Sequence, residues 1–176
     1  ERWPLAQFIS YDPTGENTKT NGLRLAFGRP HGEMLSLESA DVIVSVDADP
    51  MRHEAASRKN ARGFGAARRL EATSDSMCRI YAAECNYTPL GGMADDEVVW
   101  LARGPAPISA VRLVAAAEDL LNANGRAVLI AGDNLPAEAH ALVAAVNRAI
   151  GAVGTTVSYV PLDPESASDG VGQIAE

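Results

Sequence analysis

The chain has 176 residues, of which 47% are hydrophobic, a formal net charge of −8 and a sequence pI near 4.9. This length and apolar content are sufficient for one domain with a core of its own. The negative charge, without any long run of Lys or Arg, excludes nucleic acid as a partner. No stretch approaches the roughly 20 apolar residues that a membrane span requires, so we expect no direct membrane span.

The first part of the chain alternates predicted strands and helices. We predict strands at 5–11, 34–37, 42–46, 79–83 and 98–101, and helices at 18–27 and 54–69. The run 42–46 is apolar or β-branched almost throughout, which is typical of a strand buried on both faces of a parallel sheet. Prolines and glycine at 104–107 break the chain and indicate a joint between two halves.

The second half is more regular. We predict a helix after Ser109, a strand over 127–131, a helix beginning at Pro136 and a strand over 156–160. In the first of these helices, Arg112 and Asp119 are expected to point away from an apolar stripe. The residues predicted to form that buried stripe are Ala110, Leu113, Val114, Ala117, Leu120 and Leu121. The residues predicted to be buried on the second helix are Ala139, Leu142, Val143, Val146 and Ile150.

This order of elements predicts the fold class and the domain organisation. Helices and strands of these lengths form right-handed crossovers, so we expect an α/β fold with a mainly parallel sheet and helices on both faces. Residues 1–103 are expected to form a first α/β half, and residues 104–162 a second βαβ half packed on the same sheet. Residues 163–176 are expected to be a poorly ordered tail.

Polar residues follow two of the predicted strands. Asp47 and Asp49 come after the strand at 42–46, and Gly132, Asp133 and Asn134 come after the strand at 127–131. In an open parallel sheet the carboxyl ends of the strands form the ligand crevice, so these five residues are the candidate binding residues. The same residue types are also ordinary turn formers, so a turn that contacts no ligand is the alternative.

The cysteines and histidines do not point to a catalytic or metal site. Cys78 and Cys85 flank a predicted strand and lie too far apart along it for a disulfide, so we expect two free, buried thiols. Two cysteines do not hold an iron–sulfur cluster by themselves. His31, His53 and His140 are widely spaced and are expected at the surface. The sequence therefore predicts no catalytic residue and no metal ligand in this chain.

Several blocks of sequence, taken together, resemble one family. The blocks are 40–50 (Ala-Asp-Val-Ile-Val-Ser-Val-Asp-Ala-Asp-Pro), 61–69, 77–84, 90–95, 128–133, 138–142 and 147–157. In this order they resemble the molybdopterin-oxidoreductase-like region of the large iron–sulfur subunit of alternative complex III, a bacterial quinol:acceptor oxidoreductase of the membrane. The resemblance runs from about Leu23 to Val160 and belongs to the wider molybdopterin oxidoreductase superfamily.

The resemblance implies Rossmann-like halves of the molybdopterin oxidoreductase type. In that superfamily the motifs matching 47–50 and 132–134 line the crevice for molybdopterin guanine dinucleotide. The cofactor-binding residues implied here are Asp47, Asp49, Gly132, Asp133 and Asn134. In the alternative complex III branch this crevice is a vestige without molybdenum. The chain also has Asp96-Glu97 where the family has His-Arg, which replaces two cationic residues by acids.

The resemblance also implies a larger assembly. We expect the chain to be a fragment of a larger oxidoreductase subunit whose iron–sulfur clusters lie in a cysteine-rich domain outside it, and to be inactive alone. The implied partners are other subunits of a membrane electron-transfer complex. The implied location of the parent protein is the periplasmic side of the bacterial inner membrane.

Three functional hypotheses follow. The first is a non-catalytic scaffold section that packs against neighbouring subunits and holds no cofactor itself. The second is a functional domain of a molybdenum oxidoreductase that binds molybdopterin guanine dinucleotide in the crevice. The third is a free-standing protein that binds a small molecule.

Overall fold

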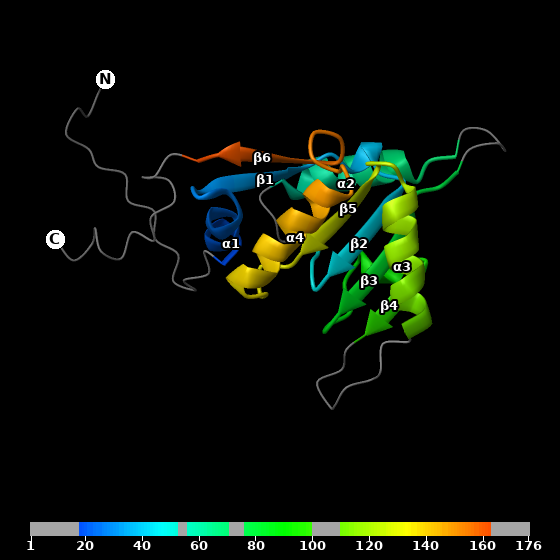
Figure 1. The fold of residues 1–176 in the computed structure, drawn as a ribbon. Helices are drawn as coiled ribbons and strands as arrows, with labels where there is room; N and C mark the ends of the chain where they lie inside the picture. The colour runs from blue at the N-terminus through cyan, green and yellow to red at the C-terminus, as the bar shows by residue number, and fades with distance from the viewer. Residues whose placement is uncertain (1–17, 53–55, 71–75, 100–109, 163–176) are drawn as a thin grey trace, which may run out of the picture.

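The computed structural model describes residues 18–52, 56–70, 76–99 and 110–162 (Figure 1). Its helices are α1 (Thr18–Phe27), α2 (Ser57–Ala67), α3 (Ala110–Asn122) and α4 (Ala137–Ala149), with short 3₁₀ turns η1 (Leu37–Ser39) and η2 (Gly91–Met93). Its strands are β1 (His31–Leu35), β2 (Val42–Val46), β3 (Arg79–Glu84), β4 (Asp96–Val99), β5 (Ala127–Ala131) and β6 (Val157–Pro161). The predictions made for 5–11, 104–107 and 163–176 lie outside the described residues.

Strand β2 is an inner strand of a four-stranded parallel sheet with the order β4-β3-β2-β5. Val42 pairs with Arg79 on β3 and with Ala127 on β5. A strand that is paired on both sides and covered on both faces has to be mostly apolar, and Ile43 is completely buried. The chain therefore has a mixed α/β fold that contains a parallel sheet.

Strand β6 differs from the prediction. It does not continue the parallel sheet but pairs antiparallel with β1 in a separate two-stranded sheet, in which Leu35 pairs with Val157. Figure 1 shows this pair running above α4 and α1. The prediction of a parallel crossover strand at 156–160 is therefore wrong.

The reason lies at the outer edge of β5. The side-chain amide of Asn147 on α4 accepts a hydrogen bond from the Leu129 N–H and donates one to the Leu129 carbonyl, both at 2.9 Å. The hydroxyl of Thr156 donates to the carbonyl of Ala127 at 2.6 Å. Side chains thus occupy backbone groups that a further parallel strand would need.

The larger core covers one face of the parallel sheet. Ile80 of β3 and Ile130 of β5 are completely buried there, and Phe64 of α2 packs on the same face. Leu35 and Val157 join this core, so the two-stranded sheet closes it from outside. Large branched side chains from several elements therefore meet on this side.

Helix α3 covers the other face with smaller side chains. Ala116 and Leu120 contact Val42, Tyr81 and Ala127 in a second, smaller core. Short side chains let a helix approach a sheet closely but bury little apolar area. The apolar core on this face of the sheet is therefore smaller than the core on the first face.

The predicted buried stripe of α3 is wrong for Leu113, Val114 and Leu121, which are exposed, whereas Leu120 is buried as predicted. Asp119, expected to point away, accepts hydrogen bonds at 2.6 Å from the Tyr81 hydroxyl and from the Arg79 guanidinium. This polar contact turns the larger apolar side chains of the helix away from the sheet. The α3 outer face, as we name it, consists of Val111 (76% exposed), Leu113 (54%), Val114 (55%) and Leu121 (68%).

Helix α4 lies between β5 and α1. Val143 is buried as predicted, whereas Leu142 is exposed. Gly22 of α1 lies so close to α4 that a Cβ there would collide with Ala137 and His140. Among the described residues, no helix has both the length and the apolar character needed to cross a membrane.

Candidate functional site

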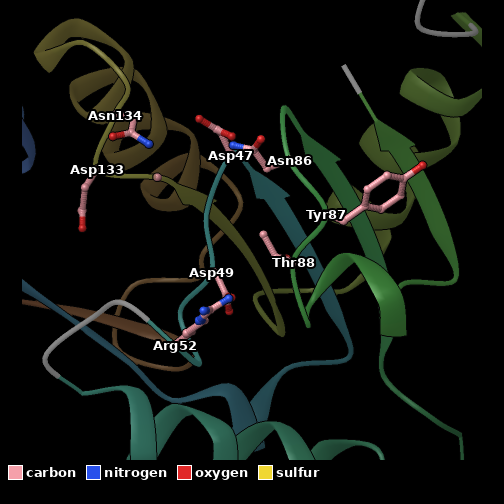
Figure 2. A pocket seen from close by; sticks show the side chains of 9 residues that line it. Asp47, Asp49, Arg52, Asn86, Tyr87, Thr88, Asp133 and Asn134 are labelled. Atoms are coloured by element: carbon pink, nitrogen blue, oxygen red, sulfur yellow. The ribbon is translucent and has the colours of Figure 1, made fainter. Parts of the chain in front are cut away.

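The carboxyl ends of three parallel strands meet at one edge of the sheet. A pocket of about 390 Å³ lies at this edge, between the turn after β2, the loop after β3 and the turn after β5 (Figure 2). Its lining residues are Asp47, Asp49, Arg52, Asn86, Tyr87, Thr88, Gly132, Asp133 and Asn134. The volume lies at the lower end of the range for small-molecule pockets.

The pocket brings together all of the candidate binding residues from the sequence. Asp47 and Asp49 line it from the β2 turn, and Gly132, Asp133 and Asn134 line it from the β5 turn. These two turns are adjacent because β2 pairs directly with β5. The geometry therefore places the five residues around one cavity.

Four lining residues were not among the sequence candidates. Asn86, Tyr87 and Thr88 follow β3, and Arg52 follows the β2 turn. The run after β3 has the composition of a loop, and β3 precedes it as a predicted strand. A signal was therefore present, because the carboxyl end of every parallel strand reaches the same edge.

Asp47 is held in an uncommon backbone conformation at the end of β2. Its φ is 50°, a left-handed value that non-glycine residues seldom adopt. Its N–H donates to the Ala83 carbonyl at 2.7 Å, and its Oδ1 accepts from the N–H of Cys85 at 3.3 Å and from its thiol at 2.8 Å. These contacts link the β2 turn to the end of β3.

The thiol of Cys85 does not have the features of an activated nucleophile. The hydrogen bond to Asp47 raises the pKa of Cys85, and partial burial adds to this effect. A raised pKa lowers the fraction of reactive thiolate at neutral pH. The prediction that Cys85 is buried is wrong, because this thiol is exposed, whereas Cys78 is buried as predicted, and both are free.

Gly132 is required by the close approach of the two turns. Its N–H donates to the Val46 carbonyl at 2.9 Å, and a Cβ on it would collide with the backbone oxygen of Asp47. Only glycine fits such a contact between two main chains. The pocket therefore depends on the absence of a side chain at this position.

Asp133 is tied to helix α1. Its carbonyl accepts from the Thr18 hydroxyl at 2.7 Å, and its carboxylate lies 3.2 Å from the ammonium group of Lys19. Because that carboxylate is half exposed, water and salt weaken the ion pair. Lys19 nevertheless offsets part of the negative charge on this side of the pocket.

The loop after β3 is anchored by a buried acid. Glu84 is 1% exposed, and its carboxylate accepts from the Thr88 hydroxyl at 2.5 Å and from the Thr88 N–H at 3.1 Å. The Thr88 hydroxyl in turn accepts from the Gly91 N–H at 3.1 Å. This network positions the loop that carries Asn86 and Tyr87 into the pocket wall.

Two of the three histidines do not have the surface positions predicted for them. His31 and His140 are buried at 7% and 4% exposure, and His53 lies outside the described residues. Burial lowers the pKa of His140, and the positive charge of Lys19 lowers it further. Its Cβ lies in the close contact between α4 and Gly22 of α1, and the residue is not part of the pocket lining.

The pocket has the chemistry of a binding site. Carboxylates, amides, one guanidinium and one phenol line it, and these groups form hydrogen bonds and ion pairs. In the part of the chain that the structure describes, no three His, Cys, Asp or Glu side chains form a group that could hold a metal ion. Neither the family-model comparison nor the comparison with curated proteins gives a match.

Proposed function

We propose that this chain is a non-catalytic scaffold section of an oxidoreductase subunit in a membrane quinol-oxidising complex, and that it acts by packing against neighbouring subunits. The observation that carries the proposal is the α3 outer face, four large apolar side chains that are each more than half exposed. Large exposed apolar side chains on one helix are typical of an interaction surface. The family resemblance supplies the identity of the assembly.

The proposal includes the finer architecture implied by the resemblance. It assigns the chain to Rossmann-like halves of the molybdopterin oxidoreductase type, from which β6 departs by pairing with β1. It places the parent protein on the periplasmic side of the bacterial inner membrane, with iron–sulfur clusters in another domain. Fractionation of cells that express a tagged parent protein tests the location.

The α3 outer face provides the main experiment. The parent protein is tagged in cells that make the complex, and Leu113 and Leu121 are both changed to Lys. We expect the wild-type protein to co-purify with haem-containing and quinol-binding membrane subunits, and the double variant to lose them, because burying an unpaired charge in an interface is costly. Leu142→Lys on α4, with a comparably exposed leucine, is the matched control and should keep the partners.

The outcome is judged on assembly and activity together. Retention of both quinol oxidation and partner subunits in the double variant would contradict the assignment of the α3 outer face. A wild-type parent protein that purifies without any membrane subunit would contradict the scaffold function itself.

The alternative function is a working domain for molybdopterin guanine dinucleotide. It is favoured by one observation, the convergence of Asp47, Asp49 and 132–134 around a single pocket. Against it, three aspartates line the cavity, and like charges about 6 Å apart repel by on the order of 3 kcal/mol each at an effective dielectric constant of 20. The β5 turn also offers one glycine, and Pro136 lacks the N–H that could bind a phosphate.

Two measurements separate the functions. Metal analysis of the parent protein is expected to show no molybdenum, whereas one molybdenum per chain would establish the alternative. Calorimetric titration of the chain with guanine dinucleotides, with and without magnesium, is expected to show no binding. Micromolar affinity in either condition would overturn the vestigial assignment of the crevice.

A further inference from the structure

The pocket at the strand ends carries more negative than positive charge. Asp47, Asp49 and Asp133 line it together with Arg52, and Lys19 lies 3.2 Å from Asp133. The three lining aspartates against the lining Arg52 leave an excess of negative charge, which Lys19 offsets only in part because it also pairs with Glu33 at 3.7 Å. Because the low-dielectric walls of a cavity concentrate the field of such groups, the pocket attracts a positively charged ligand.

Asp49 supplies an independent observation. This pocket-lining residue is 8% exposed, and its Oδ1 accepts from the Met51 N–H at 3.3 Å. Its Oδ2 is buried and has no hydrogen-bond partner among the described residues. A buried carboxylate oxygen without a donor is costly, and a ligand that donates to it removes that cost. Figure 2 shows Asp49 in the lower part of the pocket, below Thr88.

The other lining groups restrict the ligand further. Asn86, Thr88 and Asn134 provide neutral polar contacts, and the Tyr87 ring, 74% exposed, offers an aromatic face that attracts cations. Among the described residues, no three His, Cys, Asp or Glu side chains form a group that could hold a metal ion. Separate acceptors suit a molecule whose donors are spread over several ångströms.

We propose that this pocket binds a small aliphatic amine. An ammonium group of the ligand donates to Asp49 Oδ2 with a charge-assisted hydrogen bond, and its other end lies toward Asp47 and Asn86. This site goes beyond the scaffold function. Amine binding and subunit packing use different surfaces, so either can fail without the other.

The probe is putrescine, a four-carbon diamine, titrated into the chain and followed by calorimetry and by two-dimensional NMR. Its control is 1,4-butanediol, which has the same length but no charge. We expect saturable binding of one putrescine per chain, weakening as salt increases, and no saturable binding of the diol. Chemical-shift changes are expected at the three strand ends.

Asp49→Asn is the decisive variant. It keeps the Oδ1 that accepts from the Met51 N–H and removes the charge. We expect the Kd for putrescine to rise by about tenfold or more. Asp41→Asn is the matched control, because Asp41 precedes the opposite end of β2 and pairs there with Arg126. It should bind putrescine like the wild type.

Asp47→Asn is the second variant, and it decides the outcome if Asp49→Asn does not fold. Asparagine tolerates the left-handed φ of this position, and the lost charge should also weaken putrescine binding. The proposal is overturned if putrescine does not saturate, if the diol binds equally well, or if magnesium displaces putrescine from the same site. It is equally overturned if the Asp49 and Asp41 variants bind alike.

Discussion

The two faces of the parallel sheet are covered in different ways. On one face Ile80, Ile130 and Phe64 form part of a core closed by several elements, whereas on the other face α3 contributes mainly Ala116 and Leu120. The first face is held by large, completely buried side chains, and the second by a small apolar contact with a polar contact beside it. A helix with abundant apolar residues does not necessarily bury the largest of them.

The polar contact explains the orientation of α3. Asp119 binds the Tyr81 hydroxyl and the Arg79 guanidinium, and this pair of hydrogen bonds fixes the helix by its polar side. The pKa of Asp119 is lowered first by the hydrogen bond from Tyr81, and Arg79 contributes further. The contact between α3 and the sheet thus depends on the protonation state of Asp119.

Ile130→Ala in the larger core should have the largest effect. Its side chain is completely buried, and removal of such a side chain costs about 2–5 kcal/mol of unfolding free energy. Leu120→Ala on the α3 face should fall at the low end of this range, and Leu113→Ala should stay within about 0.5 kcal/mol. Urea unfolding at neutral pH measures all three. Equal losses of unfolding free energy in the Ile130 and Leu120 variants would show that the two faces of the sheet contribute equally to stability.

Tyr81→Phe should destabilise the α3 face by about 1 kcal/mol at neutral pH, because one hydrogen bond to Asp119 is lost. The lowered pKa of Asp119 means that its stabilising contribution is complete above the unfolded-state pKa of about 3.9. That contribution disappears as the pH falls through the folded-state pKa. The difference in unfolding free energy between variant and wild type should therefore be smaller at about pH 3 than at about pH 7. An unchanged gap at both values would show that Asp119 does not anchor the helix through Tyr81.

Two glycines of α2 test how tightly the larger core side is packed. A Cβ on Gly65 meets nothing within 4 Å, so Gly65→Ala should stabilise the protein by up to about 1 kcal/mol. A Cβ on Gly63 would lie 2.5 Å from Glu38 Oε2 and 3.2 Å from the Glu38 backbone nitrogen, so Gly63→Ala should gain less or lose stability. Thermal unfolding of the two variants side by side provides the measurement. A larger gain at Gly63 would mean that η1 moves freely against α2.

The two free thiols, Cys78 in the larger core and Cys85 at the edge of the pocket, differ in reactivity. Burial in the larger core raises the pKa of Cys78 to about 12, whereas Cys85 is exposed beside Asp47. Iodoacetamide should therefore label Cys85 and spare Cys78, and Asp47→Asn should speed the labelling of Cys85 because the hydrogen bond to Asp47 raises its pKa. Mass spectrometry of the labelled peptides measures both rates. Comparable labelling of the two cysteines in the folded protein would contradict the burial of Cys78.

Much of the candidate pocket could be predicted from local sequence. The turns containing Asp47 and Gly132 follow apolar strands, and in a parallel sheet such turns reach one edge whatever the order of the strands. Tyr87 and Asn86 were not among the candidates, because the composition of their loop does not distinguish a pocket wall from an ordinary connection and only its position after a parallel strand points to this edge. Their place depends on Glu84, whose role as a buried anchor appears only when the loop is folded over it.

The sequence by itself determined the local elements. The conformation of the apolar run 42–46 and of the periodic helices depends on residues that are close in the sequence. Tertiary structure alone decided two larger features. Which face of α3 contacts the sheet depends on the hydrogen bond between Asp119 and Tyr81. The pairing of β6 with β1 depends on Asn147, which occupies the edge of β5. Both outcomes rest on hydrogen bonds between residues distant in the chain, and a local pattern of apolar residues contains no information about such partners.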